Sequence, residues 1–264
     1  MKNILVCIKQ VPDTTEVKLD PVTGTLIRDG VPSIINPDDK AGLEVALQLK
    51  EKTGAKVTVV TMGPMQADVA LREALAMGAD EAVLLSGREF AGSDTWATSS
   101  AIAAALKNLD YDLIVAGRQA IDGDTAQVGP QIAEHLGIPH VSYVAKVDVE
   151  GDKLVIQRNF EDRYHVIEAT TPLLITTLGE EIEPRYMSVG GIFDAYREKE
   201  VKVWGYDDVK DNVDPANLGL KGSPTKVKKS FTKPVKAAGV LHTDISADEA
   251  VEIIVNKLKE KYII

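Results

Sequence analysis

The chain has 264 residues, 44% hydrophobic and 27% charged, which suits one large globular domain or a domain with an appendage. Its formal net charge of −10 argues against a nucleic-acid surface, which needs clustered lysine and arginine. No run approaches the roughly 20 apolar residues of a membrane span, and the first residues lack a signal-peptide pattern. The single cysteine, Cys7, excludes an internal disulfide and a thiolate metal cluster. We therefore expect a cytoplasmic protein without a nucleic-acid partner or a membrane span.

Up to about His140, short apolar runs alternate with helix-like segments. The runs are continuously apolar, as in strands of a parallel sheet that is covered on both faces. The expected strands are residues 3–9, 56–63, 81–86 and 111–117, and the expected helices are residues 38–52, 66–77 and 95–108. This alternation predicts a doubly wound, mostly parallel α/β sheet.

Capping residues support these boundaries. Gly54 and Gly78 follow helical segments, where a left-handed residue commonly ends a helix. In "NPDD" we expect Asn36 to be the N-cap of the first helix, with Pro37 at its first position. Asp38 and Asp39 would then add negative charge to the first turn, which favours a hydroxyl or a base edge over a phosphate as a ligand there. An ordinary helix cap without a ligand is the alternative.

The pattern changes after His140. Residues 142–170 alternate apolar and polar side chains around "EGDK", which predicts an antiparallel hairpin followed by a third strand. The apolar run 172–179, "PLLITTLG", can return to the main sheet as a further buried strand.

From about Glu183 the chain is lysine-rich and lacks strong periodicity until an amphipathic final helix, for which Ser246 is the expected cap. Roughly sixty residues would then have little core of their own, which is unusual inside a compact domain. We therefore predict an α/β domain over residues 1–183 and, over residues 184–264, an extended arm that packs on another protein. A mobile surface tail is the alternative.

The loop that follows the fourth strand, "AGRQAIDGDTAQVGP", is the first candidate for a ligand site. In open α/β sheets ligands bind beyond the carboxyl ends of the strands, where helices begin. Gly117, Gly123 and Gly129 would allow unusual backbone angles and close approach of a ligand. The free N–H groups of the next helix would favour an anion such as a pyrophosphate, and Arg118 would add a positive charge.

The start of that helix has two interpretations. It begins near Thr125, or at Pro130 with Gly129 as N-cap. Residues 124–127, "DTAQ", also have the form of a capping box that satisfies its own helix start, and an aspartate there would repel a phosphate. Phosphate binding and a self-capped helix therefore remain open from these residues alone.

No catalytic or metal-binding constellation is evident. The chain has no dinucleotide "GxGxxG" after its first strand, no phosphate-binding "GxxxxGK[ST]" loop and no "HExxH". The four histidines fall in separate segments, and no carboxylate pair is marked out for acid–base catalysis. Cys7, inside the first strand, is expected to be buried and inert. These features indicate a protein that holds a nucleotide, not a hydrolase.

Four separated motifs resemble the β subunit of electron transfer flavoproteins. They are "NPDDKAGLEVA", "ALAMGADEAVLL", "VAGRQAIDGDTAQVGP" and "EPRYMSVGGIFDAYREKEVKVW". The third contains the family signature, a small-residue strand end followed by Gly-(Lys/Arg)-Gln, two residues and Asp, here residues 117–122. The resemblance runs in order over nearly the whole chain. It implies a Rossmann-like fold of the adenine-nucleotide alpha hydrolase kind, and a heterodimer in which the α subunit carries FAD and the C-terminal arm wraps that subunit.

The resemblance also implies a nucleotide site. Carried over by position, its residues are Cys7, Asn36, Pro37, Asp38, Asp39, Val59, Gly117, Arg118, Gln119, Ala120, Ile121, Asp122, Gly123, Asp124, Thr125, Ala126, Gln127 and Val128.

The site of such proteins holds either structural AMP or a second FAD. In the electron-bifurcating branch that FAD takes a hydride from NADH and divides the electron pair. One electron passes through the α-subunit FAD to an acyl-CoA dehydrogenase, and the other passes to ferredoxin or flavodoxin. "DGDTAQVGP" is similar to the version in bifurcating members, whereas AMP-binding members tend to carry "DDD" followed by bulkier polar residues. The small residues Gly123, Thr125 and Ala126 would leave room for a second phosphate. We therefore expect FAD, with AMP as the alternative, and NADH-oxidising activity only together with the α subunit.

A partner-docking stretch is also implied by the resemblance, over Arg185, Tyr186, Val189, Gly190, Gly191 and Ile192. It departs from the family pattern, because Val189 stands where Leu is common and Asp194 where Lys is common. The alternative is a connector with glycine flexibility.

Two other classes compete with the redox subunit. A non-redox nucleotide-binding module of the universal-stress type shares the sheet but should end near the fifth strand, without the residues that follow Glu183. An ATP-using ligase or hydrolase would need an "SGGxDS"-like loop after the first strand, which "KQVPDTTEVKLD" does not resemble.

Overall fold

The computed structural model describes residues 1–13, 32–228 and 237–264. The chain divides into two compact units, Met1–Lys228 and Lys229–Ile264. This division falls later than the predicted one after residue 183. Residues 229–236 of the predicted arm lie outside the described residues.

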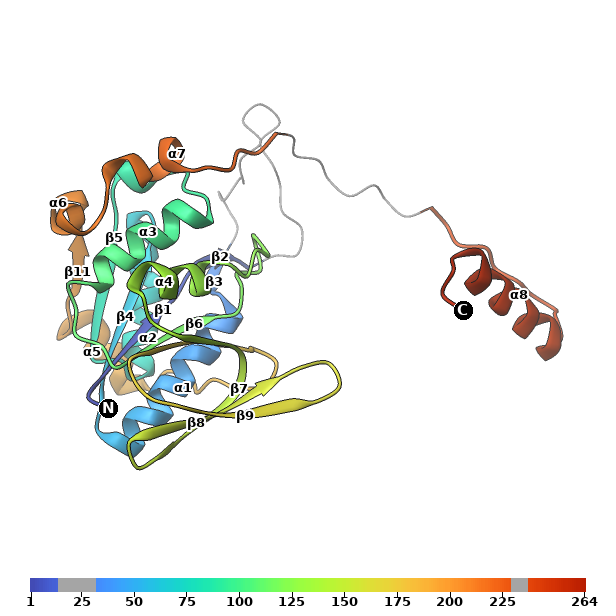
Figure 1. The fold of residues 1–264 in the computed structure, drawn as a ribbon, viewed down its shortest axis with the longest axis horizontal. Coiled ribbons are helices and arrows are strands. Elements are labelled where there is room, and N and C mark those ends of the chain that lie inside the picture. The colour runs from blue at the N-terminus through green and yellow to red at the C-terminus, as the bar shows by residue number, and fades with distance from the viewer. Residues whose placement is uncertain (14–31, 229–236) are drawn as a thin grey trace. The chain divides into compact units, whose positions relative to one another are not determined.

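The first unit is built on one sheet with the strand order β11-β5-β4-β1-β6-β10-β7-β8-β9 (Figure 1). Its strands are β1 Asn3–Cys7, β4 Lys56–Met62, β5 Glu81–Leu85, β6 Leu113–Gly117, β7 His140–Glu150, β8 Lys153–Asn159, β9 Tyr164–Ala169, β10 Leu173–Thr177 and β11 Val201–Trp204. The strands from β11 to β7 run parallel, and β8 and β9 continue antiparallel. The short strands β2 Gln10–Pro12 and β3 Ser33–Ile35 form a separate antiparallel ribbon.

Helices cover both faces of the sheet. They are α1 Pro37–Thr53, α2 Asp68–Met77, α3 Thr95–Leu106, α4 Val128–Leu136, α5 Val189–Arg197, α6 Tyr206–Val209 and α7 Gly219–Gly222, with 3-10 turns η1 Met65–Ala67, η2 Arg88–Phe90, η3 Lys210–Asn212 and η4 Pro215–Asn217. One core cluster joins the sheet to α1 and α2, as with Leu43 and Leu71, and another joins it to α3 and α4, as with Leu106 and Ile132. The predicted doubly wound α/β fold is confirmed.

The strands form where the apolar runs predict them because both of their faces are covered. Every residue of β6 and of β10 is buried, which explains why neither run alternates. The run 172–179 does return to the main sheet, as β10 between β6 and β7. The hairpin and third strand expected after His140 are β7, β8 and β9.

Residues 184–228 are more ordered than the sequence suggested. Strand β11 pairs with β5 and extends the parallel sheet, and α5 packs along α2 (Figure 1). Ala195, Val201, Val209 and Leu218 are buried. The expectation that this segment has little core is therefore wrong as far as Lys228. Its apolar residues are too widely spaced to show a local period, and they become a core only against elements that are distant in sequence.

The second unit contains α8 Ala247–Glu260, which begins with the expected cap. Ser246 and Glu249 form a reciprocal capping box. None of the residues of α8 is buried, and its apolar residues Val251 and Ile254 are exposed. Among residues 1–13, 32–228 and 237–264, no helix has both the length and the apolar character to cross a membrane.

Candidate nucleotide-binding site

The order of the strands reverses between β1 and β6. From β1 the chain continues to β4 and β5 on one side, and it then returns to β6 on the other side. Cys7 at the end of β1 lies opposite Ala116 near the end of β6. Ligands of open α/β sheets bind in the crevice beyond such a switch point. The loop 117–127 and the start of α1 both follow strands that end here.

Asn36 precedes α1 at the N-cap position, with Pro37 next, as predicted, but its side chain does not cap the helix. The side chain is fully buried and reaches the loop after β6. Its Nδ2 donates to the carbonyl of Gln119 at 2.8 Å, and its Oδ1 accepts from the N–H of Ile121 at 3.0 Å. Asn36 therefore sets the backbone shape of the loop.

The carboxylates of Asp38 and Asp39 are also committed to backbone groups. Asp39 accepts from the N–H groups of Lys9 at 2.7 Å and Gly117 at 3.0 Å. Asp38 accepts from the N–H groups of Gly179 at 2.9 Å and Gln119 at 3.3 Å. Both side chains are buried. They join the ends of β1, β6 and β10 to α1. The sequence predicted their negative charge at the start of the helix, but it did not predict these hydrogen bonds to distant backbone groups.

Burial changes the acidity of two groups at the strand ends. Desolvation raises the pKa of Asp39 to about 7, against the opposing effect of its backbone hydrogen bonds, and the charge of Asp38 adds to the rise. Desolvation, followed by the nearby charge of Asp39, raises the pKa of Cys7 to about 12. Cys7 is therefore a buried thiol at neutral pH, in agreement with the expected inert residue.

Glycine serves close packing here, not unusual backbone angles. Gly117, Gly123 and Gly129 have no left-handed φ, whereas Asp124 and Ala126 have φ of 47° and 53°. A Cβ on Gly117 would lie 2.2 Å from Oδ1 of Asp39, and one on Gly129 would lie 2.8 Å from Cγ2 of Thr176. These two glycines bring β6 against α1 and α4 against β10. A Cβ on Gly123 would meet no atom within 4 Å, so that position is open.

Helix α4 begins at Val128, between the two predicted starts. Gln127 is at the N-cap, and no side chain caps the helix. The "DTAQ" capping box is therefore wrong: Asp124 instead accepts from Nε2 of Gln119 at 3.1 Å, because left-handed φ angles turn the chain before the helix. Pro130 has no N–H, so the donors of the first turn are those of Val128 and Gly129.

Arg118 lies beside the start of α1. Its Nε is 3.3 Å from Oδ2 of Asp38, a charge contact without hydrogen-bond geometry. Its backbone N–H donates to the backbone carbonyl of Thr177 at 3.0 Å. The hydroxyl of Thr177 donates to the carbonyls of Asp38 at 3.0 Å and Ala116 at 3.2 Å. Thr177, at the end of β10, is a contact residue of this site that the sequence did not identify.

Lys9 is a second residue that the sequence did not identify. It follows β1, and its Nζ lies 2.6 Å from Oδ1 of Asp122 in the loop. The Lys9 side chain is 45% exposed, whereas that of Asp122 is only 6% exposed. The sequence does show a lysine directly after a buried strand. However, no local sequence pattern indicates that its partner is a residue 113 positions further along the chain.

The structure brings most of the predicted nucleotide residues together, with one exception. Val59 is fully buried in the middle of β4, opposite Val6, and its side chain belongs to the core on the α1 side. Strand β4 ends at Met62, nearer to the crevice. In the described part of the chain, no group of three or more His, Cys, Asp or Glu side chains is placed to hold a metal ion.

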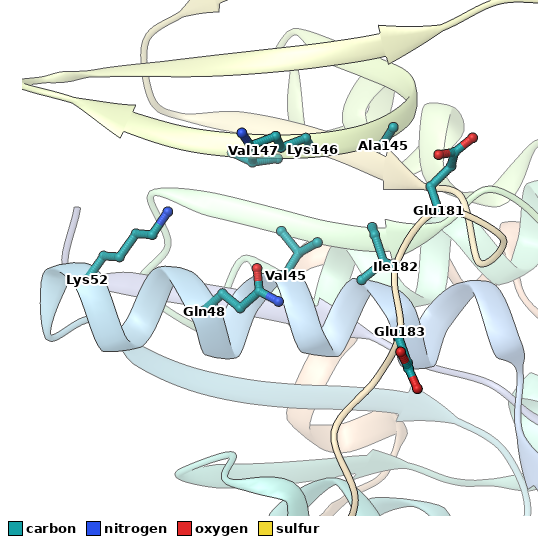
Figure 2. A pocket seen from close by; sticks show the side chains of 9 residues that line it. All are labelled: Val45, Gln48, Lys52, Ala145, Lys146, Val147, Glu181, Ile182 and Glu183. Carbon is teal, nitrogen blue, oxygen red and sulfur yellow. The ribbon is translucent and has the colours of Figure 1, made fainter.

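A groove of about 430 Å³ lies elsewhere, between α1, β7 and residues 181–183 (Figure 2). Lys52 and Lys146 line it together with Glu181 and Glu183, so both signs of charge are present. None of the predicted nucleotide residues lines this groove.

The predicted docking residues divide into an anchor and an exposed surface. Arg185 binds Glu44 through its Nε at 2.8 Å and its NH2 at 3.0 Å. Burial opposes ionisation of Glu44, but the hydrogen bonds from Arg185 outweigh it and lower its pKa. The same contact raises the pKa of Arg185. Arg185 therefore fastens its segment to α1 and is not a free charge for a partner.

Tyr186 and Val189 project to solvent, with 92% and 87% of their surface exposed. Ile192 and Phe193 are also exposed, on α5. Gly190 and Gly191 lie in the first turn of α5, so the flexible-connector interpretation is wrong. A Cβ on Gly191 would lie 2.3 Å from the carbonyl oxygen of Ala76, which shows that this glycine lets α5 approach α2.

Comparison with known proteins agrees with this architecture. The model of the electron transfer flavoprotein domain matches residues 23–208. The electron transfer flavoprotein β subunit of Clostridium acetobutylicum is 64% identical over 99% of this chain and 100% of its own length. The β subunit of Thermoanaerobacterium thermosaccharolyticum is 59% identical, with the same coverage. Subunit CarD of the caffeyl-CoA reductase–Etf complex of Acetobacterium woodii is 55% identical over 99% of both chains. The chain belongs to the electron transfer flavoprotein family, as a β subunit.

Proposed function

We propose that this chain is the β subunit of an electron-bifurcating flavoprotein and that the crevice between β1 and β6 binds FAD. When bound, FAD would accept a hydride from NADH and release the two electrons separately. One would pass through an α-subunit FAD to an acyl-CoA dehydrogenase, and the other to ferredoxin or flavodoxin.

The observation that carries this proposal is the unblocked start of α4. No side chain caps the helix, and the N–H groups of Val128 and Gly129 belong to the first turn, where an α-helix offers no partner of its own. A helix start of this kind stabilises phosphate oxygens. Gly123 is open, and Thr125 and Ala126 are small, which leaves room for a second phosphate. The residues present therefore fit a dinucleotide.

The chain's own residues would bind and orient that nucleotide. Asn36, Asp38 and Asp39 fix the loop and the ends of the strands by hydrogen bonds to backbone groups. A site held in this way loses little flexibility when a ligand binds, which favours affinity. Arg118 would add positive charge beside the phosphates, offset by its contact with Asp38.

The relatives support the redox branch. CarD is named as a subunit of a caffeyl-CoA reductase–Etf complex. A second relative, from Anaerotignum propionicum, is named as an acryloyl-CoA reductase electron transfer subunit and is 50% identical over 99% of this chain. Both names concern reductases of acyl-CoA thioesters, so we propose an enzyme of that class as the partner here.

Two exposed apolar surfaces support partner binding. We assign the docking surface, formed by Tyr186, Val189, Ile192 and Phe193, to the dehydrogenase. We assign the apolar side of α8, with Val251 and Ile254, to the α subunit. Exposed apolar side chains gathered on one segment commonly mark protein contacts.

AMP is the second candidate ligand. It carries one phosphate in place of two, and the N–H groups of Val128 and Gly129 could donate to that phosphate. The universal-stress alternative is disfavoured, because β11 and the elements α5, α6 and α7 extend the fold well beyond a module that ends near a fifth strand.

The decisive experiment is to count the ligands. The chain is co-expressed with its α subunit, the complex is denatured by heat, and the released FAD and AMP are quantified by chromatography. A second FAD per heterodimer supports bifurcation, and one FAD with one AMP defeats it. Anaerobic addition of NADH should then bleach the flavin absorbance of the complex.

A further inference from the structure

Four carboxylates lie on the two segments that form the proposed nucleotide site. Asp38 and Asp39 lie at the start of α1, and Asp122 and Asp124 lie in the loop before α4. Unscreened negative charges within several ångströms of a phosphate would oppose its binding, most strongly where water is excluded. A site for a nucleotide must therefore neutralise or turn away each of these carboxylates.

Three of the four have contacts that reduce their effect. Asp38 accepts two backbone hydrogen bonds and faces Arg118, and Asp39 accepts two backbone hydrogen bonds. Asp124 is exposed to water and bound by the amide of Gln119. The side chain of Asp122 is nearly buried, as are those of Asp38 and Asp39, but its contact is an ion pair with a lysine.

Lys9 supplies the counter-charge for Asp122. We propose that Lys9 is a positioning residue for the nucleotide: by neutralising Asp122 and tying it to the end of β1, Lys9 holds the loop 117–127 in a form that accepts an anion. This inference rests on the proposed function for its ligand. The contact between Lys9 and Asp122, at 2.6 Å across the crevice between β1 and β6, is the observation that carries it.

The backbone of Lys9 is fixed on both sides, so its side chain starts from a defined point. Its N–H donates to Asp39 at 2.7 Å, and its carbonyl accepts from the N–H of Asn36 at 2.9 Å. Removal of the ammonium group would leave the Asp122 carboxylate nearly buried and without its cation, which is much less favourable than removal of both charges together.

A double-mutant cycle tests this proposal on the complex of the full chain with the α subunit. The variants are Lys9→Met, Asp122→Asn and the two combined. AMP and FAD are titrated separately by calorimetry into the nucleotide-stripped complex. We expect Lys9→Met to weaken binding by on the order of tenfold, since it leaves the carboxylate unpaired. In the Asp122→Asn background no carboxylate remains to be paired, so the further change Lys9→Met should alter affinity by no more than about threefold.

Lys56→Met is the matched control. Lys56 also forms a 2.6 Å ion pair, with Glu81, and it is 47% exposed, but it lies at the amino end of β4. Its loss should leave nucleotide affinity unchanged. Equal weakening by Lys9→Met with and without Asp122→Asn would overturn the proposal, because Lys9 would then act on the ligand directly. Unchanged affinity in Lys9→Met would overturn it as well.

Hydrogen exchange without nucleotide separates this proposal from the proposed function. Lys9→Met should accelerate amide exchange in residues 117–127, and the double variant should do so less. If the wild-type complex binds neither AMP nor FAD, the proposed function fails, while faster exchange in Lys9→Met still supports the positioning role. Unchanged exchange in the loop contradicts that role whatever the ligand.

Discussion

Asn36 shows how one side chain can set the shape of a binding loop. It stands at a helix start, where asparagine normally caps, yet its amide spans to the backbone of Gln119 and Ile121. Local sequence favoured the cap because that is the common use of asparagine at this position. The alternative use became available only because the folded sheet places the end of β6 beside the start of α1.

We predict that Asn36→Ala destabilises the protein by about 1–3 kcal/mol, because it leaves the N–H of Ile121 and the carbonyl of Gln119 without their partner. Urea unfolding followed by circular dichroism measures the change. Asn159→Ala is the control, since the partly exposed side chain of Asn159 contacts only other side chains, those of Gln157 and Glu181, in the described residues. An equal effect of both substitutions would contradict the role given to Asn36.

Asp39 should make the protein less stable as pH rises, which is the opposite of the usual effect of a carboxylate whose pKa is lowered by folding. Its pKa in the folded protein, about 7, lies above the ordinary value of 3.8. Between these values the folded state binds more protons than the unfolded state, so the contribution of Asp39 to the free energy of unfolding falls as pH rises from about 4 to about 7. Asp39→Asn removes this titration.

The cost of Asp39→Asn relative to wild type should therefore be larger at pH 5 than at pH 8. Urea unfolding of both proteins at the two pH values measures it, and carbon NMR of the labelled carboxyl group should show a midpoint near 7. A cost that grows with pH would mean that the pKa of Asp39 is lowered instead.

At the scale of elements, the packing of helix α5 depends on a residue without a side chain, Gly191. Gly191 allows the first turn of α5 to approach the carbonyl of Ala76 at the end of α2. Gly190, the preceding residue, would meet no atom within 4 Å if it carried a Cβ. The two adjacent glycines therefore have different roles in one helix.

Gly191→Ala should destabilise the chain by about 1–3 kcal/mol through this clash. Gly190→Ala should be neutral or slightly stabilising, because alanine is the better helix former. Thermal unfolding of the two variants measures the difference. Equal melting temperatures would show that α5 does not need the close approach.

At the scale of the whole molecule, the proposed docking surface is the testable link to a partner. Val189→Ser removes an exposed apolar side chain and should lower the rate of electron transfer to the dehydrogenase by on the order of tenfold, because a few central contacts carry most of the binding energy of an interface. The nucleotide content of the complex should not change. Stopped-flow measurement of dehydrogenase reduction provides the rate.

Val166→Ser is the matched control, because Val166 is also exposed but lies on β9, in the antiparallel part of the sheet. It should leave the rate unchanged. A similar loss in both variants would show that general surface hydrophobicity, and not the docking surface, governs the encounter.

The sequence by itself determined the parallel sheet, its two helix layers and the position of the loop, because those features follow from local periodicity. A short, continuous apolar run such as residues 113–117 favours a strand that is covered on both faces, and the family signature in residues 117–122 marked the loop that follows. The capping box of α8 was also readable, since its two partners lie three residues apart.

Only the tertiary structure decided which distant residues meet. The pairing of Lys9 with Asp122, the contacts of Asp39 with Gly117 and the incorporation of β11 at the edge of the sheet depend on the order of the strands. That order is fixed by packing over the whole unit, and no local pattern encodes it. The start of α4 was misplaced for a related reason: the chain turns there through left-handed angles at Asp124 and Ala126, which are uncommon outside glycine and which the local pattern did not indicate.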